Sequence, residues 1–154
     1  MVFFKVADME EPKYDLTRPF PDLEVLFKYK FLNTPDKSIM GTKVTHPPNA
    51  STPPHTHAGA FVAVHVLTGS VLNKMNDNPM IVFTRLQDAC RHRISDNASK
   101  TEEASLFVTM VMDTGKMEAI LEKNGVAGLV VIDEEYRQEV MAQIMKLQAE
   151  QQGS

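Results

Sequence analysis

The stretch PPNASTPPHTH, residues 47–57, decides how this chain is organised. Four of its residues are prolines, which cannot donate to a strand ladder or continue a helix. The stretch therefore predicts a stiff, extended loop that leads the chain directly into His55 and His57. Because these histidines are two residues apart, an extended backbone turns both imidazoles to the same face.

Short runs of strand-forming residues lie on both sides of this loop. From 23 to 32, for example, Leu23, Val25, Phe27 and Tyr29 alternate with mostly charged residues, as in a half-buried strand. A turn is expected at 76–79, Asn-Asp-Asn-Pro. Many short strands separated by turns predict an all-β sandwich or barrel. The expected strands are 23–32, 38–46, 61–67, 71–73, 80–84, 92–95, 106–112 and 126–132.

The two ends of the chain differ in character from this middle part. Residues 1–22 contain prolines among charges and predict an N-terminal arm. Residues 23–133 are expected to form the barrel. From 134 to 152, apolar residues recur at helical spacing after Asp133, a good N-cap, which predicts one C-terminal α-helix packed on the outside of the barrel.

Composition narrows the class of protein. The chain has 154 residues, a formal net charge of −4 and a single cysteine, Cys90, so a disulfide scaffold is excluded and a reducing, cytoplasmic location is expected. No basic stripe predicts nucleic-acid binding, and no apolar run is long enough to span a membrane. The expected partner is a small molecule.

The histidines are the main candidates for chemistry. His92 opens a later predicted strand and is expected to join His55 and His57 in one pocket. Three neutral imidazoles suit a divalent ion such as Fe, Zn, Mn or Ni, with open positions for substrate or water. His65 is expected to face away from the pocket, and His46 to make a structural hydrogen bond.

Other residues are weaker candidates, each with an ordinary alternative. On a regular strand Asp96 shares a face with His92, where it could orient a histidine or act as a base; a turn-forming role is the alternative. Arg91 and Arg93 could bind an anionic group, or be solvated edge charges. Met40 and Met110 could shape an apolar substrate cavity, or simply fill the core.

Two segments resemble the motifs of the cupin superfamily. Residues 49–69, with His55, His57 and the closing Gly69, resemble the first motif, and residues 89–97, with His92, resemble the second. Val62 stands where the family has a glutamate ligand, and Asn49 where it has a glycine. The segments most resemble small fungal RmlC-like cupins of secondary metabolism.

This resemblance implies a fold and a function. The fold is the cupin double-stranded β-helix, a jelly-roll barrel, and cupins often form homodimers. The implied function is an enzyme acting on a small, apolar, oxygenated, polyketide-like molecule, with His55, His57 and His92 as metal ligands, Asp96 as a further catalytic residue, and Arg91, Arg93, Val62, Met40 and Met110 near the substrate. Metal-assisted or histidine-mediated isomerisation, cyclisation, dehydration or decarboxylation is expected.

Two other functions stay open from the sequence. Three-histidine iron sites also occur among cupin-like dioxygenases, so the resemblance leaves a non-haem iron dioxygenase open. Alternatively, the replaced glutamate and the altered second motif fit a binding module that has lost its metal and holds a small ligand without catalysis.

Overall fold

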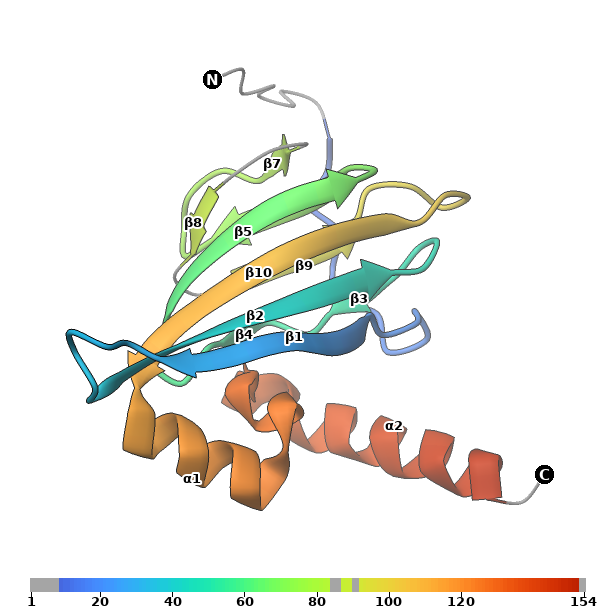
Figure 1. Cartoon of the computed structure of the whole chain (residues 1–154). Helices are drawn as coiled ribbons and strands as arrows, with labels where there is room; N and C mark the ends of the chain where they lie inside the picture. The colour runs from blue at the N-terminus through green and yellow to red at the C-terminus, as the bar shows by residue number, and fades with distance from the viewer. Residues whose placement is uncertain (1–8, 84–86, 90–91, 153–154) are drawn as a thin grey trace.

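The computed structural model describes residues 9–83, 87–89 and 92–152, which form two facing antiparallel sheets with helices at one end (Figure 1). The strands, in chain order, are β1 (Asp22–Lys30), β2 (Lys37–His46), β3 (Ser51–Thr52), β4 (His55–Thr56), β5 (Phe61–Thr68), β6 (Val71–Met75), β7 (Ile81–Phe83), β8 (Gln87–Ala89), β9 (His92–Asn97), β10 (Ala104–Asp113) and β11 (Val131–Ile132).

The first sheet has the strand order β1-β2-β10-β5-β8 and carries most of the core. Alternation buries residues 38, 40 and 42 of β2, 62 and 64 of β5, and 106, 108, 110 and 112 of β10 on the inner face. Met110 sits opposite Met40 on one side and Val62 on the other, and all three are buried. Residues 109 and 111, on either side of Met110 in β10, are only half-buried. The sheet therefore has one core face and one outer face.

The second sheet runs β11-β4-β9-β6-β7, and β3 also pairs with β9. β6 and β7 form a hairpin around the expected turn, in which Asn76 has a positive φ of 51° and the Asn78 amide donates to the Met75 carbonyl. Of the strand expected at 80–84, residue 84 lies outside the described part.

The proline-rich loop differs from expectation in its centre. Ser51 and Thr52 form β3, paired with Asp96 and Ser95, although the loop was predicted to contain no strand. The two residues lie between the proline pairs and keep their own amide groups, so they can join a ladder that the prolines cannot. Asn49, two residues before β3, has a φ of 63°, in the left-handed region that asparagine tolerates.

The prediction of a single helix was wrong, because α1 (Thr114–Asn124) precedes the expected α2 (Glu134–Gln152). Met117, Ile120 and Leu121 have helical spacing and pack against the core. The strand expected over 126–132 is a 3₁₀ turn, η1 (Val126–Leu129), followed by the two-residue β11. Gly125, with a φ of 64°, ends α1 and redirects the chain.

α2 packs against the N-terminal arm and lies at the lower end of the barrel in Figure 1. Tyr136 meets Tyr14 edge to face with ring centroids 5.7 Å apart, and the Gln143 amide donates to the Leu16 carbonyl. Val140 is buried, whereas Met145 is exposed. Within the described residues, no helix is long and apolar enough to cross a membrane.

Gly69 closes the loop after β5, and replacing it by alanine is expected to destabilise the fold by about 2 kcal/mol or more. Its φ is +71°, and an added Cβ would lie 2.8 Å from the Glu103 carbonyl oxygen and 2.9 Å from the Ala104 Cα. Urea unfolding measures the effect. Gly115→Ala is the matched control, since nothing lies within 4 Å of its Cβ position; equal losses in both variants would contradict this account.

Candidate metal centre

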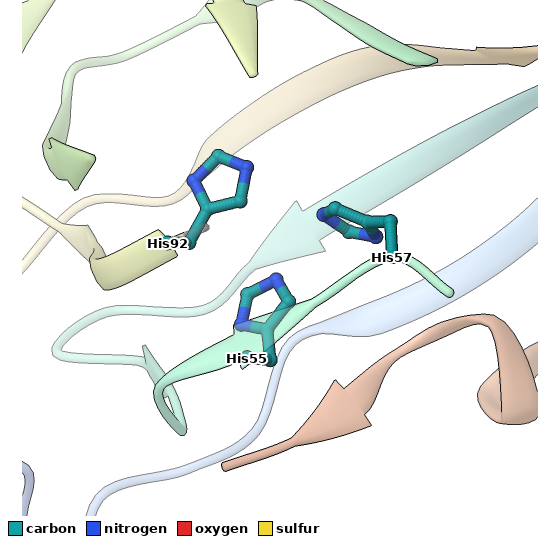
Figure 2. A group of neighbouring side chains, drawn as sticks. All are labelled: His55, His57 and His92. Atoms are coloured by element: carbon teal, nitrogen blue, oxygen red, sulfur yellow. The ribbon is translucent and has the colours of Figure 1, made fainter. Parts of the chain in front are cut away.

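Three histidines from two separate stretches of chain meet inside the barrel, as the sequence predicts. His55 begins β4, His57 follows that strand, and His92 begins β9 directly opposite His55. The ring centroids are 4.8 Å apart for His55–His57, 5.1 Å for His55–His92 and 5.3 Å for His57–His92. Figure 2 shows the three rings gathered around a common space.

Hydrogen bonds orient two of these rings. The Nδ1–H of His55 donates to the Pro53 carbonyl at 2.7 Å, and the Nδ1–H of His92 donates to Asn73 Oδ1 at 2.8 Å. With the proton held on Nδ1, the lone pair of Nε2 is left for another partner. This arrangement is typical of metal-ligating histidines, whose second nitrogen is fixed by a carbonyl or carboxylate.

The donor set fits a divalent metal ion. One nitrogen from each ring can be chosen so that all lie within 4.8 Å of one another. His57 Nδ1 is buried and has no hydrogen-bond partner among the described residues, so this nitrogen is available to an ion, while the Leu129 backbone contributes a hydrogen bond to the same ring. Neutral imidazole nitrogens are ligands for Zn, Fe, Ni and Cu, and suit Mn less well.

Burial keeps the three rings in the neutral form that a metal requires. It lowers the pKa of His57 to about 3, with a further contribution from nearby His55. Burial also lowers the pKa of His55, and it lowers that of His92 well below the ordinary value. Three rings packed this closely disfavour one another's protonated forms, which is the electrostatic setting of a cation site.

The histidines open onto a cavity of about 70 Å³ between the two sheets. One wall is apolar and comes mainly from the first sheet, with Val44, Val64, Leu106, Val108 and Met110. The other wall is mixed and comes from the second sheet and its flanks, where Val71 and Leu72 lie with the polar residues Thr52, Asn73, Ser95 and the histidines. Among the described residues that line the cavity, none carries a carboxylate, an ammonium or a guanidinium group.

Asp96 does not lie with the histidines, because β9 is irregular. Lys74 pairs with Ile94 but Met75 pairs with His92, so Arg93 is an extra residue that bulges from the ladder. After the bulge Ser95, rather than Asp96, faces the cavity. The shared face expected for His92 and Asp96 required a regular strand, and the bulge removes it.

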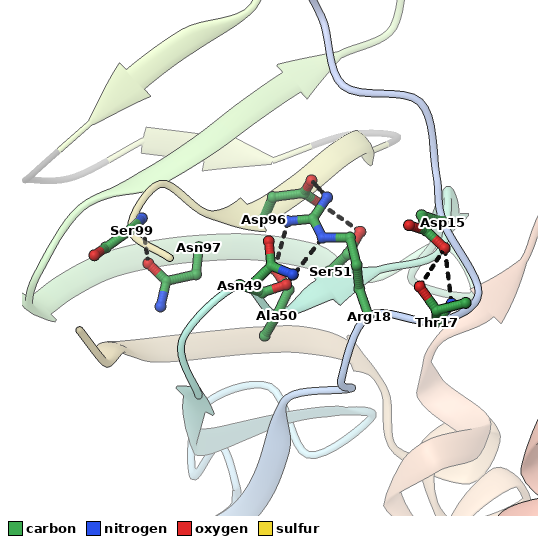
Figure 3. A network of polar contacts seen from close by, with 9 residues as sticks. All are labelled: Asp15, Thr17, Arg18, Asn49, Ala50, Ser51, Asp96, Asn97 and Ser99. Carbon is green, nitrogen blue, oxygen red and sulfur yellow. Dashed lines mark hydrogen bonds and ion pairs between the residues drawn. The ribbon is translucent and has the colours of Figure 1, made fainter. Parts of the chain in front are cut away.

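Asp96 instead anchors the N-terminal arm (Figure 3). Its carboxylate accepts from Arg18 at 2.5 Å and from the Ser51 hydroxyl at 2.7 Å. The Arg18 guanidinium also donates to the carbonyls of Asn49 at 2.9 Å and Ala50 at 3.1 Å. Burial raises the pKa of Asp96 against the opposing effects of Ser51 and Arg18. This network joins the N-terminal arm, the proline-rich loop and β9 through hydrogen bonds.

The remaining predicted residues are dispersed. Met110 lines the cavity, whereas Met40 and Val62 lie in the core beside it. Arg93 is partly exposed and lies 3.7 Å from Asp77. Arg91 and Cys90 lie outside the described residues. His65 is exposed on the outer face of β5, as predicted.

Sequence reasoning missed Asn73, which positions His92, and underrated His46. For the structural hydrogen bond predicted for His46, the backbone of Ser95 is the nearby group, but neither ring nitrogen makes a hydrogen bond of normal geometry to a described residue. A signal for both was available, because inward alternation along β2 and β6 places His46 with Val44, and Asn73 with Val71, on the cavity side.

Asn73→Leu is expected to weaken zinc binding by about 10- to 100-fold without removing a ligand. The leucine keeps the side-chain volume but cannot hold the His92 ring. Competition with a chromogenic zinc chelator measures the affinity. Thr68→Val, which breaks a hydroxyl pair with Ser105, is the control and should bind zinc normally. An unchanged affinity in Asn73→Leu would show that this hydrogen bond does not prepare the site.

The metal-free chain should lose stability as the pH falls from 6.5 to 5. Burial lowers the pKa of His46 to about 4 and that of His57 to about 3. Above pH 6.5 these rings are neutral in both states; below it the unfolded chain binds protons that the folded chain rejects. Each ring then lowers the free energy of unfolding by up to about 1.4 kcal/mol for every pH unit below 6.5. Urea unfolding with chelator present measures this slope. His46→Gln should reduce it, and a flat profile would contradict the burial of neutral histidines.

Comparison with known proteins supports the fold. No family model matches the sequence, and no curated protein matches it. The cupin domain of Cnp3 from Schizosaccharomyces pombe aligns with 17% identity and a TM-score of 0.50, covering 75% of this chain and 76% of that one. A cupin domain from Bordetella pertussis aligns with 19% identity and a TM-score of 0.48, covering 62% of this chain and 97% of that one. The Cnp3 match and the two facing antiparallel sheets show that this chain has the cupin fold.

Proposed function

We propose that this chain is an enzyme that holds a divalent metal ion on His55, His57 and His92 and moves protons on a small oxygenated molecule. The observation that carries the proposal is the cluster itself: three buried, neutral imidazoles whose nitrogens lie within 4.8 Å, at the wall of a cavity. A merely structural cluster would pair its ring nitrogens with protein groups, yet His57 Nδ1 has no such partner among the described residues.

A divalent ion in this position would supply Lewis acidity toward a carbonyl or hydroxyl oxygen. The chain's own residues prepare this chemistry. Pro53 and Asn73 fix the rings of His55 and His92, and the apolar wall with Val64 and Val108 keeps water from a bound molecule. Because the three ligands are neutral, the protein does not offset the charge of the ion, which favours an enolate or carboxylate as the bound group.

The cavity wall supports a largely apolar substrate. Within its described lining there is no charged side chain, so ionic groups of a ligand have no protein counter-ion. The apolar character of these walls matches a polyketide-like molecule, and the likeness of residues 49–69 and 89–97 to cupins of secondary metabolism supports the same class.

The reaction in this proposal is non-oxidative: isomerisation, cyclisation, dehydration or decarboxylation. Each of these needs a proton moved near a polarised oxygen. The rings that would hold the ion have no lone pair free to accept it and the described lining carries no carboxylate, so the proposal assigns the proton acceptor to water. The proposal assigns Asp96 to holding the arm, because Arg18 and Ser51 occupy its carboxylate on the far side of β9.

Proton exchange on a simple hydroxyketone tests the proposal. In heavy water, the zinc-loaded chain is expected to exchange the α-protons of acetoin about 100-fold faster than the same concentration of free zinc, with or without dioxygen. Proton NMR follows the exchange. His57→Ala should reduce the rate to that of free zinc, whereas His65→Ala, on the outer face of β5, should not.

The other functions make different predictions in this assay. Exchange no faster than free zinc, with zinc and acetoin both bound, would contradict the proposal and favour a binding module. Consumption of dioxygen by the iron-loaded chain in the presence of acetoin, without proton exchange under nitrogen, would favour a three-histidine dioxygenase.

A further inference from the structure

A fourth histidine faces the same cavity but does not belong to the metal cluster, the name used below for His55, His57 and His92. His46 is the last residue of β2, is 1% exposed and lines the cavity beside Val44. The group of nitrogens that could share an ion contains His55, His57 and His92 and not His46. The metal site therefore does not explain why a histidine stands here.

The fold does not explain it either. The main chain of His46 is satisfied, since its carbonyl accepts from Asn97 Nδ2 at 3.1 Å. The ring is different: Nδ1 and Nε2 are both buried, and although the Ser95 backbone lies close enough to act on the ring, neither nitrogen makes a hydrogen bond of normal geometry to a described residue. Buried polar side-chain atoms are nearly always paired, and two unpaired nitrogens on one ring destabilise the protein unless something else binds them.

The ring offers both halves of a hydrogen-bonding pair. Burial lowers the pKa of His46 to about 4, against an opposing hydrogen-bond contribution from the backbone of Ser95 and with a further lowering by His55. The ring is therefore neutral near pH 7, with one N–H donor and one nitrogen acceptor. A hydroxyl group, which both donates and accepts, matches this ring, whereas a carboxylate, which only accepts, does not.

The position of His46 places this polar contact away from the metal cluster. His46 lies near Ser95, which follows His92 on β9 beyond the Arg93 bulge. The cavity that His46 and the three clustered histidines line also has apolar walls, which include Leu106 and Val108 from the facing sheet. A ligand that reaches both ends must therefore carry an apolar section between two oxygen functions.

We propose that His46 is a second anchor that selects substrates with a hydroxyl group several bonds from the group held by the metal cluster. This inference rests on the proposed function and deepens it. The substrate class it names is a small hydroxylated carboxylate or enolisable ketone with an apolar middle. His46 is a binding residue in this account, and the three clustered histidines keep the chemistry.

A chain-length series separates the two ends of the ligand. Straight-chain carboxylates from propanoate to hexanoate are compared with their ω-hydroxy counterparts by calorimetry on the zinc-loaded chain. At one or two chain lengths the hydroxyl is expected to raise affinity about tenfold. His46→Leu should abolish that increment while leaving the affinity of the unsubstituted acids within about threefold. His46→Gln, which keeps one donor and one acceptor, should retain part of it.

Two controls make the result decisive. His65→Leu, at an exposed position on the outer face of β5, should leave every affinity unchanged. The hydroxyl of 2-hydroxybutanoate can reach the metal-bound end, so its increment should survive His46→Leu. If at no chain length the hydroxyl raises affinity, or if the increment persists in His46→Leu, the anchor is disproved.

The experiment also separates this inference from the metal proposal. Failure of the wild-type chain to bind zinc would contradict the proposed function. The anchor is then tested in the metal-free chain with 1-butanol, which should shift the ring nitrogen resonances of His46 in ¹⁵N NMR and leave those of His65 in place. Unshifted His46 resonances under saturating butanol would disprove the anchor independently of the metal.

Discussion

Replacing His57 by alanine is expected to weaken zinc binding by more than about 100-fold, beyond the effect of losing a partner that only orients a ligand. His57 is the ring whose Nδ1 makes no hydrogen bond to the described protein, so its removal breaks no visible structural contact of that atom. Two imidazoles would remain, too few for a tight site. Competition titration with a zinc chelator, together with metal analysis of the purified variant, measures the loss.

The folded state of this variant is the necessary control. Because His57 is neutral and buried, its replacement by alanine leaves a small cavity rather than an unpaired charge, and the metal-free variant should melt cooperatively. Zinc should raise the melting temperature of the wild-type chain and not that of His57→Ala. Equal zinc affinity in the two proteins would exclude His57 from the site.

The second large effect is expected at the arm anchor, where Arg18→Met should destabilise the chain by about 3–5 kcal/mol. The Arg18 and Asp96 side chains are only 12% and 4% exposed, and the variant leaves the Asp96 charge buried without its cation. Urea unfolding at pH 7 measures the loss. Because burial already raises the pKa of Asp96, removal of Arg18 should raise it further, so the loss should shrink as the pH falls and the carboxyl becomes protonated.

A second ion pair of equal length shows that burial is the cause. Lys37 and Asp113 also approach to 2.5 Å, but their side chains are 42% and 61% exposed. Lys37→Met is therefore expected to cost far less stability than Arg18→Met. Asp96→Asn added to Arg18→Met should recover part of the stability, since it removes the unpaired charge. Similar losses in Arg18→Met and Lys37→Met would contradict the role of the buried network.

The parts of this molecule that could be predicted from its sequence are those that depend on the spacing of residues close together in the chain. Alternation along β2, β5 and β10 indicates the core face of the first sheet, and the spacing of His55 and His57 puts both rings on one side of an extended chain. The third ring depended on a long-range pairing of β4 with β9, which the family resemblance supplied.

The parts that could not be predicted depend on irregularity or on contacts between distant residues. The bulge at Arg93 has no signature in its own sequence, yet it decides that Ser95 and not Asp96 faces the cavity. Arg18 and Asp96 are 78 residues apart, and no local pattern joins them. The helix α1 did have a pattern, in Met117, Ile120 and Leu121, but it follows a strand without a loop.

The two faces of β9 have different roles: one faces the cavity with the histidines, and the other binds the N-terminal arm. On the inner face, His92 lies with His55 and His57, and Ser95 lies near His46. On the outer face, Asp96 binds Arg18 and holds the arm. The homodimer and the cytoplasmic location inferred from the sequence stay predictions.

X-ray absorption spectroscopy of the zinc-loaded chain tests the central claim most directly, because it counts the imidazoles around the metal. The account predicts one zinc per chain with three imidazole nitrogens at about 2.0–2.1 Å, and one imidazole fewer in a variant that lacks His92. Zinc bound through fewer than three imidazoles in the wild-type chain, or no stoichiometric zinc at all, would contradict it.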